Sequence, residues 1–324
     1  MTCELFQIAA AFSRRPLDLI TTLGNAMLAD PEAGARRASA SLNPEGIPIE
    51  LAVTASDDRL KFRLVVDPAA TDANPAQRYR RGRAALREAV VLNGTELLHA
   101  TFARQLDAML PDDGARLAAY RSGPFCMAAS VDEPGIATYI DASTHAEDAF
   151  QRACSWLEEC LPDARDALAA VHTMRPIAQL SAVGIEGSTP RRALAKLYWR
   201  LTSPVTLSSL GIEAFASADF ACFLRLALRE RRVPASGLML AAGFSMNDGS
   251  LHDAKINLCG HCLDWGHKNW PGVVDDCTQV FGLAAIPTRE ALSRPQIDVS
   301  FLTFGCDRYG NRRINSYFRP TEKQ

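Results

Sequence analysis

The stretch Ala195-Lys196-Leu197-Tyr198-Trp199-Arg200-Leu201 decides how the rest of the chain is interpreted. As a β-strand it places Lys196, Tyr198 and Arg200 on one face and apolar side chains on the other, because successive side chains of a strand point to opposite faces. As a helix the run 191–201 is also acceptable, since its leucines recur at helical spacing and its residues have good helix propensity. The strand is favoured because the same alternation of polar and apolar residues recurs at four other places.

Five pairs of alternating segments, each joined by a turn-rich gap, predict five β-hairpins. The predicted hairpins cover residues 47–67, 125–141, 177–201, 237–259 and 297–319. In the third hairpin we expect a first strand over 177–185 and a loop over 186–190. In the fourth we expect the second strand to begin at Lys255. The later hairpins recur at intervals of about 60 residues, which is typical of an internal repeat.

Segments with helical periodicity separate the hairpins. They cover 17–28, 77–110 with an interruption near Asn93-Gly94, 146–170, 208–232 and 272–281. Ten antiparallel strands joined in this way can bury one face under the helices and remove their edges by closing into a barrel. The sequence therefore predicts an α+β fold of αββα repeats: a closed ten-stranded antiparallel barrel surrounded by helices, as a single domain over residues 1–324.

If the apolar faces lie outside, under the helices, the polar faces must line the lumen of the barrel. The predicted lumen residues are Glu50, Lys61, Arg63, Tyr139, Lys196, Tyr198, Lys255, Asn257, Arg313, Asn315 and Tyr317. Burying so many polar groups without partners would cost several kcal/mol each, so a dry core is excluded. The lumen is expected to be a wet chamber or a ligand site.

Composition narrows the class of protein. The 324 residues are 48% hydrophobic and 22% charged, with a formal net charge of -2. This balance argues against a nucleic-acid-binding protein, which would carry a basic excess or a basic stripe. No apolar run approaches the length that spans a bilayer, and no signal peptide is apparent, so we expect a cytoplasmic protein without a membrane partner. The nine cysteines are expected to be reduced core thiols rather than a disulfide framework.

At this point the sequence resembles the prenyltransferases of the αββα (ABBA) barrel fold, which transfer a prenyl group from an isoprenoid diphosphate to an aromatic or other nucleophilic acceptor. The resemblance rests on short motifs at matching hairpin positions: Lys196-Leu197-Tyr198, Lys255-Ile256-Asn257, Arg313 to Tyr317, and the acid and base Glu50 and Arg63. The segment Leu180 to Ile185 also resembles the cyanobactin-type branch, which modifies peptides. Hairpin two departs from the pattern, because Ala137-Thr138-Tyr139 has the tyrosine without the lysine before it.

The resemblance implies roles that the chemistry also requires. Ionisation of an allylic diphosphate leaves a carbocation beside pyrophosphate, so the site needs cations for the leaving group and aromatic rings that stabilise the carbocation and exclude water. We assign the diphosphate clamp to Arg63, Lys196, Lys255 and Arg313 and the carbocation shield to Tyr139, Tyr198 and Tyr317. Lys61, Asn257 and Asn315 would line the rest of the lumen. Glu50 is the predicted catalytic residue, which accepts the acceptor's proton; the alternative is that it only pairs with Lys61 or Arg63.

The expected ligands are an isoprenoid diphosphate and either a peptide or an aromatic small molecule as the acceptor. The aspartate-rich Mg²⁺ motif of the helical prenyl synthases is not apparent, so no metal ligand is assigned to the protein. Mg²⁺ bound through the diphosphate is a plausible helper.

Two other classes of protein remain open. Cys259-Gly260-His261-Cys262, with His267 and Cys277 nearby, has the short ligand spacing of a zinc site. On a strand, however, Cys259 and Cys262 would face opposite sides, so they could not share a metal without a bulge. The second alternative is a non-catalytic barrel that binds an anionic ligand. Glu50 argues against it, because an inward acid has little use in an anion trap.

Overall fold

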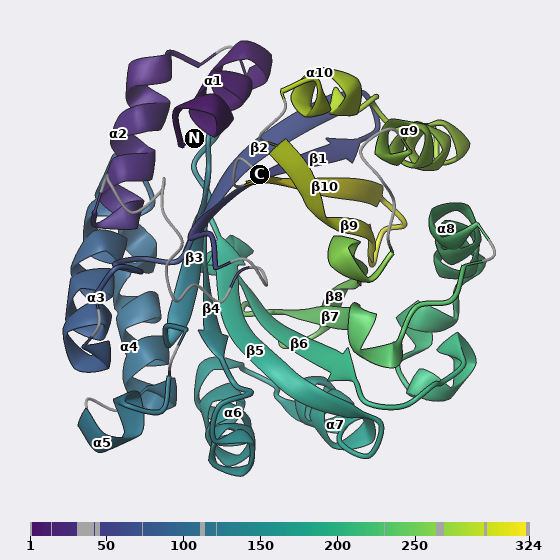
Figure 1. Cartoon of the computed structure of the whole chain (residues 1–324). Helices are drawn as coiled ribbons and strands as arrows, with labels where there is room; N and C mark the ends of the chain where they lie inside the picture. Colours follow the sequence, from purple (N-terminus) through teal and green to yellow (C-terminus); the bar gives the residue numbers. More distant parts are fainter. Residues whose placement is uncertain are drawn as a thin grey trace.

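The computed structural model describes residues 2–13, 15–30, 42, 46–72, 74–110, 114–120, 122–229, 231–263, 269–294 and 297–321. Ten antiparallel strands form a closed barrel in the order β1-β10-β9-β8-β7-β6-β5-β4-β3-β2, and helices surround it (Figure 1). The strands are β1 Ile49–Ser56, β2 Arg59–Val66, β3 Phe125–Ser130, β4 Ile136–Asp141, β5 Ala178–Gly187, β6 Leu194–Leu201, β7 Leu238–Ser245, β8 Leu251–Cys259, β9 Ile297–Asp307 and β10 Arg312–Pro320. The predicted fold class is confirmed. The stretch 195–201 is a strand, so its helical interpretation is wrong.

Helices fill the gaps between the hairpins. They are α1 Thr2–Ser13, α2 Leu17–Leu28, α3 Pro75–Leu92, α4 His99–Met109, α5 Gly114–Leu117, α6 Ala146–Cys160, α7 Arg165–Met174, α8 Ala218–Leu228, α9 Trp270–Val280 and α10 Thr288–Leu292, with short 3-10 turns at η2 Glu96–Leu98, η3 Pro190–Arg192, η4 Leu207–Leu210, η5 Glu213–Ala216, η6 Ala235–Gly237 and η7 Gly260–Cys262. Nowhere in the described part of the chain is a helix both long enough and apolar enough to cross a bilayer.

One helical prediction is confirmed and two need correction. The interruption expected near Asn93-Gly94 is real, because Gly94 has a φ of +69° and ends the regular hydrogen bonding of α3. The segment 146–170, expected as one helix, is two, α6 and α7. Pro162 explains the break, since a proline inside a helix removes a hydrogen bond and clashes with the preceding turn. The segment 208–232, expected to be helical throughout, begins with the 3-10 turns η4 and η5, and its α-helix is confined to α8.

The apolar strand faces pack outward against the helices. Leu197 and Trp199 of β6 are 0% and 1% exposed, and Phe304 of β9 stacks with Phe223 of α8 at a ring distance of 5.6 Å. A separate, small apolar cluster, Ala52, Val65, Ala128 and Ala137, lies on the opposite strand faces. The barrel wall therefore has an apolar outer side under the helices and an inner side that is free to carry polar groups.

The strands extend further than predicted at two places. β5 continues through Glu186 and Gly187, which were expected to lie in a loop, and β8 begins at Leu251, four residues before Lys255. In both cases a charged residue at the strand end resembled turn sequence, although it continues the inward alternation. These extensions bring Glu186 and Asp253 to the lumen.

Candidate active site in the barrel lumen

The register of the strands brings the predicted cations to one face of the barrel wall. Lys196 pairs across β6 with Gly184 and Gly243, and Lys255 pairs across β8 with Ala241 and Gly305. Their cross-strand neighbours are thus glycine or alanine, whose small size leaves room on the inner face of the barrel for the long lysine side chains. A Cβ added at Gly243 would lie 3.1 Å from the Nζ of Lys196. These small residues are part of what forms the chamber.

Arg63 and Arg313 also face inward, from β2 and β10. Arg313 pairs with Gly305, where an added Cβ would lie 3.0 Å from the guanidinium carbon of Arg313. Arg63 pairs with Ala52 on one side and Ser130 on the other. All four predicted clamp residues therefore come from the second strand of a hairpin and face the same chamber.

Two carboxylates connect the clamp residues into a chain of alternating charge. Arg63 donates to Glu186 at 2.7 Å, and the other oxygen of Glu186 lies 3.8 Å from Lys196 Nζ. Lys196 donates to both oxygens of Asp253 at 2.7 Å, and Arg313 donates to Oδ2 of Asp253. Both acids were missed from the sequence. The predicted strand 177–185 stops just before Glu186, and the predicted strand that begins at Lys255 starts just after Asp253.

The two carboxylates are ionised. Burial opposes the charge of Asp253, but Lys196 and Arg313 outweigh it and lower the pKa of Asp253 to about 2. Burial likewise opposes the charge of Glu186, and the neighbouring Arg63, Lys196 and Lys255 hold its pKa well below the usual value. The resting clamp therefore contains four cations and two anions.

Burial makes Lys255 easier to deprotonate than an ordinary lysine. Its Nζ lies over the ring of Tyr198, 5.7 Å from the centroid. Burial lowers the pKa of Lys255 to about 8, although the charge of Glu186 acts in the opposite direction. The group therefore titrates near neutral pH, and a bound anion would stabilise its charged form.

This shift predicts a pH dependence. The pKa of Lys255 in the folded protein is below that of a free lysine. Between about pH 8 and the ordinary lysine pKa, the unfolded chain therefore binds more protons than the folded one. The contribution of this group to the free energy of unfolding consequently rises with pH over that interval. This set of cations loses a positive charge over the same interval, so we expect any affinity of the site for a diphosphate anion to fall above pH 8. We expect diphosphate binding at pH 8.5 to take up protons, measured by calorimetry in buffers of different ionisation enthalpy. Lys255→Met should abolish the uptake; uptake that persists in this variant would contradict the assignment.

The three predicted shield tyrosines lie in the same chamber. Tyr139 and Tyr198 make an edge contact with ring centroids 5.6 Å apart, and Tyr317 makes a similar contact with Phe301 at 5.8 Å. Burial raises the pKa of each of the three phenols. They therefore remain neutral and present aromatic surface beside the cations, as stabilisation of a carbocation requires.

Glu50 lies on the inner face of β1 and is 2% exposed. It pairs with Val65, while Arg63 lies two residues further along β2, opposite Ala52. The cations named as its structural partners have other acids: Arg63 pairs with Glu186, and Lys61 pairs with Glu133 at 2.5 Å. The charge of Glu50 contributes to the raised pKa of Tyr317, after burial and Glu186, which places the acid near the shield.

The remaining predicted lumen residues differ in position. Lys61 faces inward but is half exposed, because it lies at the barrel end that carries the hairpin turns. Asn257 donates to the carbonyl of Met239 at 2.8 Å. Asn315 pairs with Thr303, and Asn315 Oδ1 and Thr303 Oγ1 are buried atoms without a hydrogen-bond partner. Such atoms usually bind water or a ligand.

The structure describes only part of the cysteine motif. Cys259 ends β8 and Cys262 lies in η7, and both thiols are free. Burial raises the pKa of Cys259 to about 11, so in the absence of a metal this thiol is protonated. His267 lies outside the described residues. Among the residues that are described, no group of three His, Cys, Asp or Glu side chains could hold a metal ion.

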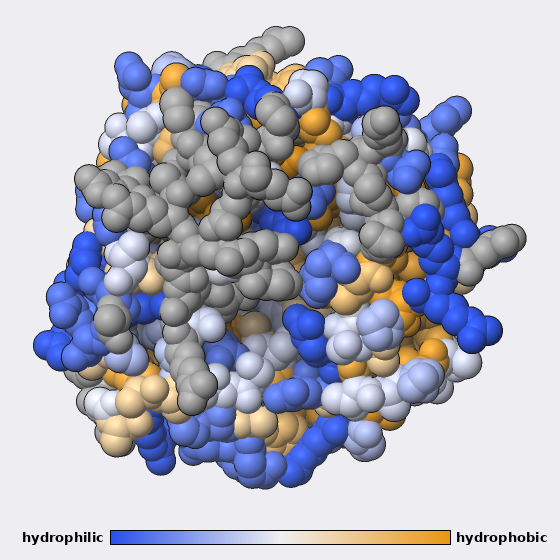
Figure 2. Space-filling model, in the orientation of Figure 1, coloured by the Kyte–Doolittle hydropathy of each residue, from blue (hydrophilic) through white to orange (hydrophobic). Residues whose placement is uncertain are grey.

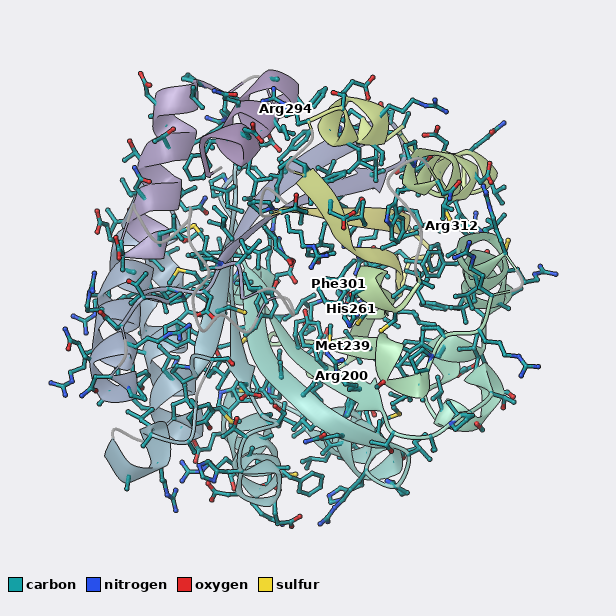
Figure 3. All side chains as sticks on the ribbon, viewed as in Figure 1. Arg200, Met239, His261, Arg294, Phe301 and Arg312 are labelled. Atoms are coloured by element: carbon teal, nitrogen blue, oxygen red, sulfur yellow. The ribbon has the colours of Figure 1, made fainter. Side chains whose placement is uncertain are left out.

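At the end of the barrel away from the hairpin turns, a second set of side chains follows the wall. Figure 3 shows Phe301, His261, Met239 and Arg200 one below another within the ring of strands. Arg200 donates to the carbonyl of Ser236 at 2.9 Å. Figure 2 shows the same face, where hydrophilic residues dominate and apolar surface appears in patches between them. Arg200, on the face of Lys196 and Tyr198, was not assigned a role from the sequence.

Comparison with solved structures identifies this architecture. 6-Dimethylallyl tryptophan synthase matches with a TM-score of 0.79 at 11% identity, over 99% of this chain and 98% of that one. 5-Dimethylallyl tryptophan synthase from Streptomyces coelicolor, in complex with DMASPP and Trp, matches with a TM-score of 0.76 at 14% identity, over 100% and 96%. AnaPT from Neosartorya fischeri matches with a TM-score of 0.70 at 13% identity, over 88% and 81%. No family model and no curated protein sequence matches the chain. The chain has the αββα-barrel fold.

Proposed function

We propose that this αββα barrel is a prenyltransferase that moves a dimethylallyl or geranyl group from an isoprenoid diphosphate to a nucleophilic acceptor. The observation that carries the proposal is the convergence of four cations and three neutral tyrosines in one chamber of the barrel. The 5-dimethylallyl tryptophan synthase with the same fold was solved with DMASPP and Trp, which supports the same substrate classes here.

The chain's own residues have distinct tasks in this reaction. Arg63, Lys196, Lys255 and Arg313 hold the diphosphate, and their charges stabilise the negative charge that develops when the C1–O bond breaks and its electrons move to the leaving oxygen. The acceptor atom then forms its bond to the allylic carbon, and Glu50 takes the proton that the acceptor releases. The diphosphate leaves as pyrophosphate.

The tyrosines protect the carbocation from water. Replacing Tyr198 by Ala removes both its contact with Tyr139 and its ring surface, so we expect prenylation to slow by about 2- to 30-fold, the loss of one cation–π contact of about 0.5–2 kcal/mol. The fraction of diphosphate converted to prenyl alcohol should rise, measured by chromatography of both products. Tyr309→Ala, an equivalent change at a ring that is 69% exposed outside the chamber, should leave this ratio unaltered. An unchanged ratio in Tyr198→Ala would remove the residue from the shield.

The acceptor belongs to one of two classes. An aromatic small molecule, such as an indole, is favoured by the likeness to enzymes named for tryptophan. A cyanobactin-like peptide, suggested by the sequence of β5, remains a second proposal, because a peptide side chain that is aromatic or nucleophilic would enter the chamber through the same opening. The single domain over residues 1–324 and the cytoplasmic location also stay predictions.

Mg²⁺ remains a predicted helper bound through the diphosphate. The chamber's acids, Glu186 and Asp253, already accept hydrogen bonds from cations, so the protein's own contribution to such an ion would come after the diphosphate has displaced one of these contacts. When bound, the ion would neutralise charge on the leaving group. Activity with and without a chelator decides this point.

A product screen tests the proposed function. The protein is incubated with dimethylallyl or geranyl diphosphate and a panel of indoles, phenols and peptides, and the products are identified by mass spectrometry. A prenylated acceptor supports the proposal, and its identity settles the acceptor class. Binding of diphosphate without any product from the whole panel would favour the non-catalytic anion binder. Stoichiometric zinc in the purified protein would favour the zinc alternative.

A further inference from the structure

Asp253 lies where a diphosphate oxygen would be expected to bind. Its side chain is 6% exposed, and its two oxygens accept both contacts from Lys196 and one from Arg313. Bidentate contacts of lysine and arginine with a pair of anionic oxygens are the same contacts that these cations make with phosphate. In the resting chamber the protein's own carboxylate therefore satisfies two of the four cations assigned to the clamp.

Glu186 occupies a corresponding place for the other half of the clamp. It accepts from Arg63 at 2.7 Å and lies 3.8 Å from Lys196. It is less enclosed, since its side chain is 26% exposed. The two acids and three cations form a continuous chain, Arg63, Glu186, Lys196, Asp253, Arg313, that crosses the chamber.

We propose that Asp253 is an internal competitor of the diphosphate: it releases Lys196 and Arg313 when the isoprenoid diphosphate binds and retakes them when pyrophosphate leaves. This inference rests on the proposed function. A clamp of four unopposed cations would bind pyrophosphate, the more highly charged product, more tightly than the substrate and would release it slowly. A competing carboxylate weakens both complexes and speeds the return to the open clamp.

The competing explanation is that Asp253 only holds Lys196 and Arg313 in position. The two explanations predict opposite signs for the isosteric variant Asp253→Asn. If Asp253 competes, removing its charge strengthens the binding of an anion; if it only positions the cations, removing the charge releases them and weakens that binding.

The test measures the binding of inorganic pyrophosphate to the purified full chain by calorimetry. One unit of charge a few ångströms from a bound anion in a largely enclosed site changes affinity by about tenfold or more, so we expect Asp253→Asn to bind pyrophosphate at least tenfold more tightly than the parent. Its steady-state turnover should fall while its first turnover stays fast, which appears as a burst of product. Asp107→Asn removes the same charge from the surface of α4, where Asp107 pairs with Arg83, and should bind pyrophosphate like the parent.

Equal or weaker pyrophosphate binding by Asp253→Asn overturns the inference. If that variant does not fold, Glu186→Gln is used in the same assay, because it removes the other competing charge. Tighter pyrophosphate binding by Glu186→Gln supports competition, and equal or weaker binding overturns the inference. A parent protein that binds no pyrophosphate would instead contradict the diphosphate clamp of the proposed function, which separates the failure of the two ideas.

Discussion

Replacing Glu50 by Gln is expected to lower the rate of acceptor prenylation by about 10²–10⁴-fold while the protein folds and binds the diphosphate normally. The amide keeps the size and much of the hydrogen bonding of the carboxylate, but it cannot accept a proton. An acceptor that attacks a carbocation, whether through an aromatic carbon or through a heteroatom of an indole, phenol or guanidinium group, must lose a proton. Glu50 is the acid on the inner face of β1, buried beside the tyrosine shield, whereas Glu186 and Asp253 accept hydrogen bonds from Arg63 and Lys196.

The measurement is single-turnover formation of prenylated product, together with the affinity for pyrophosphate. Glu133→Gln is the matched control, since Glu133 is more than half exposed and pairs with Lys61 at the opposite end of the barrel. A Glu50→Gln variant as active as the parent would remove Glu50 from the mechanism. A variant that fails to fold would favour a structural role for this acid.

Replacing Lys196 by Ala is expected to weaken diphosphate binding and slow ionisation together by about 10- to 150-fold, which corresponds to the loss of one charge-assisted contact of about 1.5–3 kcal/mol. The upper end is expected, because the variant also frees the charge of Asp253. In the parent, Lys196 neutralises that carboxylate from 2.7 Å. Without the lysine, a buried anion faces the incoming diphosphate with Arg313 as its partner.

Pyrophosphate affinity and the rate of prenyl transfer measure the Lys196→Ala effect. Lys61→Ala is the comparison, since it removes a lysine that also belongs to an inner strand face but is half exposed and lies at the hairpin-turn end. We expect a clearly smaller effect there. Normal turnover by Lys196→Ala would mean that the clamp is misassigned.

Much of the fold was predictable because the signal is repeated. Alternation in 195–201 alone fits a strand or a helix, but the same alternation in four other hairpins favours the strand, and closing ten such strands into a barrel removes their edges. The helical periodicity between hairpins then fixes which strand faces lie outside. The break between α6 and α7 was missed because apolar residues recur at helical spacing on both sides of Pro162, from Trp156 in α6 to Ala170 in α7.

The candidate site was predicted less completely, for a physical reason. Long cationic and aromatic side chains inside a barrel are recognisable from their alternation with apolar residues, and Lys196, Lys255 and Tyr198 were found in this way. The residues that shape the chamber are Gly184, Gly243 and Gly305, which carry no side chain and give no signal by themselves. Glu186 and Asp253 lie at strand ends, where a charged residue resembles a turn. Glu186 reaches Lys196 within its own hairpin, but Arg63 is distant from Glu186 in sequence, and Lys196 and Arg313 are distant from Asp253, so only the register of the barrel brings these pairs together.

The acceptor is the part of the function that the strands do not encode. The strands supply the inward-facing charges, whereas residues of the connections, such as His261 of η7, lie near the end of the barrel (Figure 3). Connections vary in conformation more than strands do, so their side chains cannot be placed from periodicity.

We propose that this chamber couples the loss of pyrophosphate to the prenylation of an acceptor. The most direct measurement is the stoichiometry of the two products when the parent protein is supplied with dimethylallyl diphosphate and tryptophan, or with whichever acceptor the product screen identifies. We expect one pyrophosphate for each prenylated acceptor, with little prenyl alcohol. Diphosphate that binds to the protein and remains intact with every acceptor would contradict it.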